Sequence, residues 1–201
     1  MSKSAGPETR QGDSSEIYVK FIDVLFAIVL GQSFVLLSSS SGLASWMTNP
    51  SSHIWDMLNT VLNYSLIITS WVGYHDSVRT LPIRKIWRFI IDIILLFLYY
   101  LGFTYVSSFP RLSMVLVLVF MLYFLWNVAR FFEYRNVEEY VSRYKLLNRT
   151  WEAFGFAVIF AFIAYISNSL PEPTIGGVMW AAVLLVFIIY RKRFWGGPRS
   201  Q

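Results

Sequence analysis

Long apolar runs alternate with short polar segments along most of the chain. A helix needs about 20 mostly apolar residues to cross the hydrocarbon core of a bilayer. Six runs approach or reach that length, at residues 17–41, 53–74, 86–107, 112–132, 151–167 and 175–190. The pattern predicts an all-α polytopic membrane protein, with six transmembrane helices over residues 17–193. Residues 1–16 are expected to form a disordered cytoplasmic tail, and residues 194–201 a loose C-terminal tail.

The basic residues predict how these helices are oriented. Lysine and arginine in short loops mark the cytoplasmic side of a membrane protein. With six helices, 16 of the 17 basic residues fall on one side and only Arg111 falls on the other. Both termini are therefore expected in the cytoplasm. The net charge of +5 follows from this topology, so the expected partner is the lipid bilayer and no nucleic acid is expected.

Composition excludes several kinds of site. The chain is 56% hydrophobic and has no cysteine, so disulfides, thiolate metal sites and cysteine nucleophiles are excluded. It has two histidines, and it lacks a glycine-rich phosphate loop and a G-x-S-x-G motif. We expect no cofactor, no metal and no enzyme activity. An intramembrane enzyme with Asp23 and Asp92 as a carboxylate pair is the weakest alternative, because no substrate-binding feature accompanies them.

Several polar residues interrupt the apolar runs near their cytoplasmic ends. Such residues are costly in a membrane and usually have a partner or a water-filled path. We expect an inner polar network formed by Lys20, Asp23, Trp71, His75, Asp92 and Asn127. Asp76, Arg88 and Glu152 lie at the same level and either join this network or reach the headgroup region. Specific pairing is favoured for Asp23 and Asp92, since each lies inside an apolar run.

The first helix carries a second polar feature. Gln32 lies nine residues after Asp23, about 180° around a helix with 3.6 residues per turn, so the two face different surroundings. Ile28, Gln32, Val35 and Ser39 share one face of this helix. This face either lines a polar path or forms hydrogen bonds to an adjacent helix. In the outer loops, Asp56 and Glu172 form a slightly acidic mouth or are simply solvated carboxylates.

The segment "FIDVLFAIVL" at residues 21–30 resembles the first helix of the transmembrane-protein-175 family of potassium-selective channels. The matching positions are Phe21, Asp23, Phe26, Ala27 and Ile28, and the second helix ends in a similar aromatic-plus-histidine pair, Trp71 and His75. The resemblance implies a homotetramer around a central pore lined by the first helix. It also implies potassium as the permeant ion and no carbonyl filter loop.

The resemblance places the family's constricting apolar rings on Ile28, Gln32 and Val35. Gln32 stands where relatives have an apolar residue, and Ile22 stands where the family motif has a serine. The expected function is a cation channel, permeable to potassium, in the plasma membrane of a prokaryote. The alternative is a non-conducting membrane scaffold or effector subunit, with a partner protein bound to cytoplasmic loops such as residues 130–149.

Overall fold

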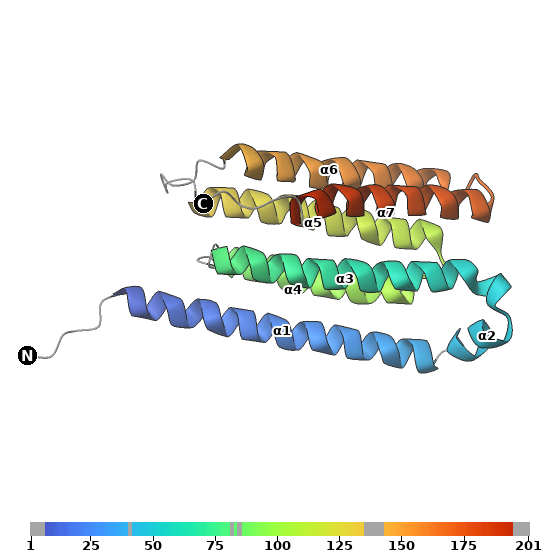
Figure 1. The fold of residues 1–201 in the computed structure, drawn as a ribbon, viewed down its shortest axis with the longest axis horizontal. Helices are drawn as coiled ribbons and strands as arrows, with labels where there is room; N and C mark the ends of the chain where they lie inside the picture. Colours follow the sequence, from blue (N-terminus) through green and yellow to red (C-terminus); the bar gives the residue numbers. More distant parts are fainter. Residues whose placement is uncertain (1–6, 40–41, 81–82, 84–85, 135–142, 195–201) are drawn as a thin grey trace, which may run out of the picture.

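The computed structural model describes residues 7–39, 42–80, 83, 86–134 and 143–194, and all regular structure in them is helical (Figure 1). In chain order the elements are α1 (Pro7–Ser39), α2 (Gly42–Thr48), the 3-10 helix η1 (Pro50–His53), α3 (Ile54–Thr80), α4 (Ile86–Thr104), α5 (Phe109–Tyr134), α6 (Arg143–Ile166) and α7 (Glu172–Phe194). The expected all-α fold is confirmed.

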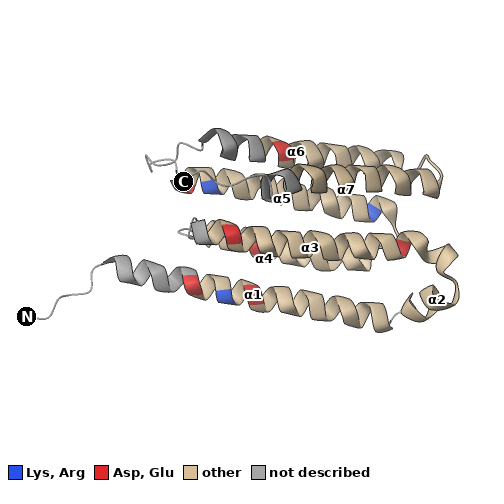
Figure 2. Ribbon diagram, viewed as in Figure 1, with Lys and Arg blue, Asp and Glu red and all other residues tan. Residues whose placement is uncertain are grey.

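The six long helices run side by side and alternate in direction (Figure 1). One end of the bundle, called the terminal end here, contains the start of α1 and the end of α7. The ends of α3 and α5 and the starts of α4 and α6 also lie there (Figure 1). The short elements α2 and η1 lie at the opposite end. Among the described residues, most of the charged positions lie toward these two ends of the ribbon (Figure 2).

Among the described residues, four helical stretches are long and apolar enough to cross a membrane, which indicates an integral membrane protein. They are Glu16–Ser38, Ile86–Thr104, Phe109–Tyr134 and Glu172–Ile189. In α6 the apolar part, Thr150–Ile166, is shorter than a typical span. The remaining long helix, α3, is among the expected six but not among these four, because polar residues interrupt its apolar sequence.

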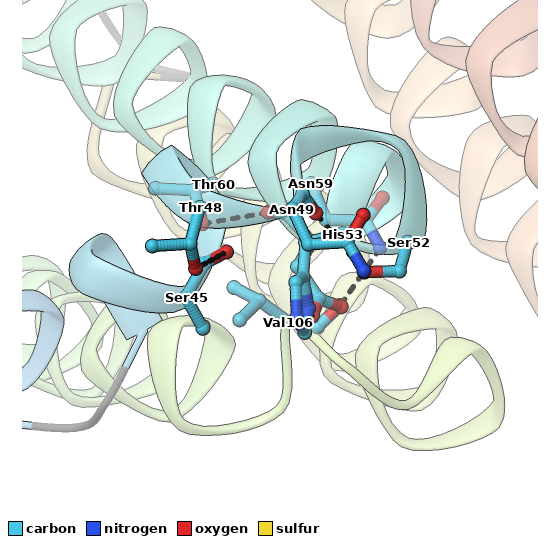
Figure 3. A network of polar contacts seen from close by, with 9 residues as sticks. Ser45, Thr48, Asn49, Ser52, His53, Asn59, Thr60 and Val106 are labelled. Atoms are coloured by element: carbon cyan, nitrogen blue, oxygen red, sulfur yellow. Dashed lines mark hydrogen bonds and ion pairs between the residues drawn. The ribbon is translucent and has the colours of Figure 1, made fainter.

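The polar residues of α3 are used in packing against the end of α4. Asn59 donates a hydrogen bond from Nδ2 to the carbonyl oxygen of Val106 at 2.8 Å (Figure 3). Asn63 is also buried, and a Cβ atom added at Gly102 would lie only 2.4 Å from its Oδ1. Any side chain at position 102 would therefore displace the Asn63 amide from its place between α3 and α4. The low hydropathy of α3 thus reflects polar contacts inside the bundle.

The first helix begins earlier than predicted. It starts at Pro7, so residues 7–16 are helical although they were expected to belong to a disordered tail. Proline is favoured in the first turn of a helix, because it lacks the N–H group that would have no partner there. Residues 1–6 and 195–201 lie outside the described residues, as does 135–142 of the segment expected to bind a partner.

The hydrophobic core lies mainly among α4, α5, α6 and α7. Phe120 of α5 stacks on Phe160 of α6 with ring centroids 5.4 Å apart, and it also contacts Phe156. Trp55, at the start of α3, lies where a Cβ atom at Gly176 of α7 would be, so these two helices meet closely at the opposite end. In contrast, α1 lies at the edge of the bundle, beside α3 and α4 (Figure 1).

Candidate functional site

One face of α1 is not buried by any other part of the chain that the structure describes. Ile28, Gln32 and Val35, called the α1 stripe here, are all exposed on this face. A Cβ atom added at the neighbouring Gly31 would meet no atom within 4 Å, so the space beside Gln32 is open. Three of the four residues predicted to line a pore are therefore exposed together. The side chain of Ser39 lies outside the described part of the chain.

The opposite face of α1 is buried against α3 and α4. Ile22, Phe26 and Ser33 are its most buried residues. Ser33 donates from Oγ to the carbonyl oxygen of Leu30 at 2.7 Å, and its Oγ lies 2.8 Å from the Tyr64 hydroxyl of α3. Since the serine proton is used toward Leu30, Tyr64 is the donor to Ser33. Gln32, one position earlier, lies about 100° around the helix from Ser33 and is exposed.

Asp23 links α1 to α3 near the terminal end. Trp71 Nε1 donates to Asp23 Oδ1 at 3.0 Å, and His75 Nε2 lies 2.7 Å from the same oxygen. A carboxylate only accepts hydrogen bonds, so the His75 tautomer or imidazolium with a proton on Nε2 is the donor. The cluster is partly open, since the Asp23 and His75 side chains are 39% and 26% exposed. The structure thus brings together three of the six residues expected in the inner polar network.

Lys20 is not part of this cluster. Its ammonium group lies 2.7 Å from the Glu16 carboxylate, one turn earlier on the same helix, and both side chains are largely exposed. The structure therefore does not bring Lys20 together with the other residues expected in the inner network. The long flexible side chain instead remains at the surface, where its charge stays hydrated.

A second charged cluster joins α4 to α5. Arg88 Nη1 donates to Glu133 Oε2 at 2.9 Å, and both side chains are only 1% exposed. The Arg88 guanidinium also lies over the Trp126 ring, 4.6 Å from its centroid, and Arg130 lies 5.6 Å from the same centroid. Of the two interpretations of Arg88, the structure supports membership of an inner polar cluster over reaching the headgroups. Glu133 was missed, because the fourth span was predicted to end at residue 132.

Asp92 and Asn127 lie in the wall of a cavity between the two clusters. This cavity has a volume of about 150 Å³ and lies among α1, α3, α4, α5 and α7. Asn127 donates from Nδ2 to the Tyr123 carbonyl oxygen of its own helix at 2.8 Å. No hydrogen bond among the described residues joins Asp92 or Asn127 to Asp23. The single inner network predicted from sequence is thus separated into an α1–α3 cluster, an α4–α5 cluster and a cavity.

The two expected residues of the outer mouth lie at the opposite end of the bundle. Asp56 is in the first turn of α3, where its Oδ2 lies 3.3 Å from His53 Nδ1 (Figure 3 shows this segment). Glu172 is exposed in the first turn of α7. Acidic residues are favoured there by the partial positive charge of a helix N-terminus. Within the described ranges, no group of three histidine or acidic residues is placed to hold a metal ion.

The chain was compared with models of known protein families, with curated proteins and with solved structures, and it matches none of them.

Proposed function

We propose that the chain is one subunit of a homo-oligomeric cation channel, expected to be a tetramer, in which α1 lines a central pore. The observation that carries this proposal is the two-sided character of α1. Its buried face packs against α3 and α4 through Ile22, Phe26 and Ser33, while the α1 stripe is left exposed by the described residues. A stripe that combines apolar residues with an amide is unusual for a lipid-facing surface, because the amide has no hydrogen-bond partner in hydrocarbon.

In an oligomer, the α1 stripe would contact either the water of a central pore or the α1 helices of neighbouring subunits. Four copies of α1 around an axis would place Gln32 as a ring of amides between apolar rings of Ile28 and Val35. Apolar rings exclude water and can gate by dewetting, whereas amides donate and accept hydrogen bonds to water or to each other. The ring of Gln32 would therefore be the most hydrated level of the constriction.

The proposed topology has six spans with both termini in the cytoplasm of a prokaryotic cell. The alternating directions of six long helices support it, because the starts of α1, α4 and α6 lie at one end (Figure 1). Arg111 lies in the first turn of α5, and Asp56 and Glu172 lie in the first turns of α3 and α7, so all three are near helix starts at the opposite end (Figure 1). Potassium is proposed as the permeant ion on the similarity of residues 21–30 to the channel family named above.

Flux through reconstituted liposomes tests the channel proposal. Purified protein is reconstituted, and potassium, sodium and chloride gradients are applied in turn, with protein-free liposomes as the control. We expect potassium flux above that of sodium and little chloride flux. An intact oligomer that passes none of the three ions would contradict the channel and favour the non-conducting scaffold. A disulfide cross-link at Ile28→Cys reports whether the α1 stripes of two subunits face each other, because the chain has no cysteine of its own and a covalent dimer can form only through this position.

A further inference from the structure

The short helix α2 presents apolar side chains at the end of the bundle opposite the terminal end (Figure 1). Met47 is 84% exposed and Leu43 is 44% exposed. The two residues are four positions apart, so they share one face of the helix. The helix packs mainly against α1 and η1, its neighbours in the chain. Leu43 and Met47, called the α2 face here, are thus left exposed by the described residues.

The preceding helix determines the depth at which α2 lies. The apolar stretch Glu16–Ser38 of α1 has 23 residues, and its length at 1.5 Å per residue is about 35 Å. The hydrocarbon core of a bilayer is about 30 Å thick, so this stretch is long enough to cross it. The helix α2 begins at Gly42, shortly beyond that stretch. In a membrane α2 therefore lies at the level of the lipid headgroups.

The segment around α2 lacks the charges that are typical of a loop in water. Residues 24–55 contain no lysine, arginine, aspartate or glutamate. Attraction to anionic lipids therefore cannot hold α2 at the membrane surface, because that attraction needs basic residues. The hydrophobic effect remains, and it favours the removal of Leu43 and Met47 from water. Trp46 lies between them in the sequence, and tryptophan is enriched where membrane and water meet.

The backbone at the end of α2 is hydrogen-bonded within the chain. Thr48 Oγ1 lies 3.0 Å from the carbonyl oxygen of Ala44 and 3.1 Å from that of Ser45, and its hydroxyl group donates to this turn (Figure 3). The backbone N–H of Asn49 donates to the Ser45 carbonyl oxygen at 2.8 Å. A carbonyl group that already accepts a hydrogen bond loses less when it leaves water. The last turn of α2 can therefore approach lipid without leaving these carbonyl oxygens unpaired.

We propose that α2 is an interfacial anchor whose α2 face inserts into the phospholipid bilayer beneath the headgroups. The partner is the glycerol and upper acyl-chain region of the lipid, whatever the charge of its headgroups. A helix of seven residues is too short to span a bilayer, so α2 lies along its surface. There it would hold the end of α1 at a fixed depth. The anchor requires α1 to cross the membrane, but it does not require α1 to line a pore.

Electron paramagnetic resonance of a spin label tests this contact with lipid. Single cysteines are introduced by Leu43→Cys, Met47→Cys and Ser51→Cys and labelled with a nitroxide, which is site-specific because the chain has no cysteine of its own. The full-length protein is placed in phosphatidylcholine nanodiscs. Oxygen concentrates in lipid and a nickel chelate in water, so the ratio of their collision rates with the label reports its depth. Ser51, exposed in η1, is the matched control.

We expect the logarithm of the oxygen-to-nickel ratio to be positive for the labels at positions 43 and 47 and negative for the label at position 51. A negative value for Met47→Cys would place the α2 face in water and overturn the proposal. Low collision rates of this label with both reagents would show that protein, such as a second subunit, covers the α2 face. That result would also overturn the proposal.

A label introduced by Ala44→Cys tests whether the nitroxide itself drives insertion. Ala44 is exposed and directly follows Leu43, about 100° around the helix from it. We expect a clearly lower logarithm at position 44 than at position 43, because only the α2 face enters lipid. Equal values at the two positions would overturn the assignment of this face. None of these readings depends on ion flux, so failure of the anchor and failure of the channel are distinguishable.

Discussion

The two charged clusters at the terminal end differ in what surrounds them. Asp23, Trp71 and His75 join α1 to α3 in a cluster that is partly open, whereas Arg88 and Glu133 join α4 to α5 with almost no exposure. Charges that remain hydrated gain little from pairing, while a buried charge that loses its partner is left in a medium that solvates it poorly. The α4–α5 attachment should therefore tolerate substitution far less than the attachment of α1.

The largest effect is expected from Glu133→Leu. This change leaves the Arg88 guanidinium buried without its carboxylate, which typically costs about 3–5 kcal/mol of unfolding free energy. Unfolding in mixed detergent micelles, followed by circular dichroism, measures the loss. The double variant Arg88→Met with Glu133→Leu should recover most of it, because apolar residues of similar volume replace a buried pair at little cost. A single variant as stable as the parent would contradict the buried pair.

A smaller effect is expected from Asp23→Asn. The amide keeps the shape of the carboxylate but weakens the hydrogen bonds from Trp71 and His75, which should cost about 1–2 kcal/mol. The same unfolding measurement applies, with Asp56→Asn as a control whose partner His53 lies on the same segment. The contrast between the clusters would fail if Asp23→Asn destabilised the protein as much as Glu133→Leu.

The smallest effect is expected from Lys20→Gln. This change removes an exposed pair with Glu16 within one helix, and such pairs contribute little to stability because both charges remain hydrated. Its midpoint of unfolding should be nearly that of the parent and should not depend on salt. A loss comparable to that of Asp23→Asn would show that Lys20 takes part in the polar attachment of α1 after all.

The partners of Asp23 could be narrowed down from the sequence, because only residues at the same depth in the membrane can contact it. In antiparallel helices, Asp23 near the start of the first and His75 near the end of the second must lie at one level. Trp71 is one turn from His75 and shares its face. The depth of a residue in the bundle does not specify which faces of neighbouring helices pack together, however. The sequence alone could therefore not separate Asp92 and Asn127 from the Asp23 cluster.

Other features depended on where helices begin and end. Glu133 lies in the last turn of α5, just beyond the apolar run, so hydrophobicity gave no reason to include it. The early start of α1 had a recognisable signal, since Pro7 followed by Glu8 is typical of a helix N-terminus. The polar character of α3 is explained only by its contacts with α4, and such contacts are not visible in a single sequence.

The proposed channel function depends on the α1 stripe lining the pore, and the environment of this stripe can be measured directly. Gln32→Cys places one thiol on the α1 stripe, and Phe162→Cys places one on an exposed position of α6. A positively charged methanethiosulfonate reagent is added during potassium flux, and mass spectrometry determines whether each thiol has reacted. The channel account predicts that Gln32→Cys is modified and its flux is blocked, while flux through Phe162→Cys is unchanged. Complete modification of Gln32→Cys with undiminished potassium flux would contradict a pore lined by α1.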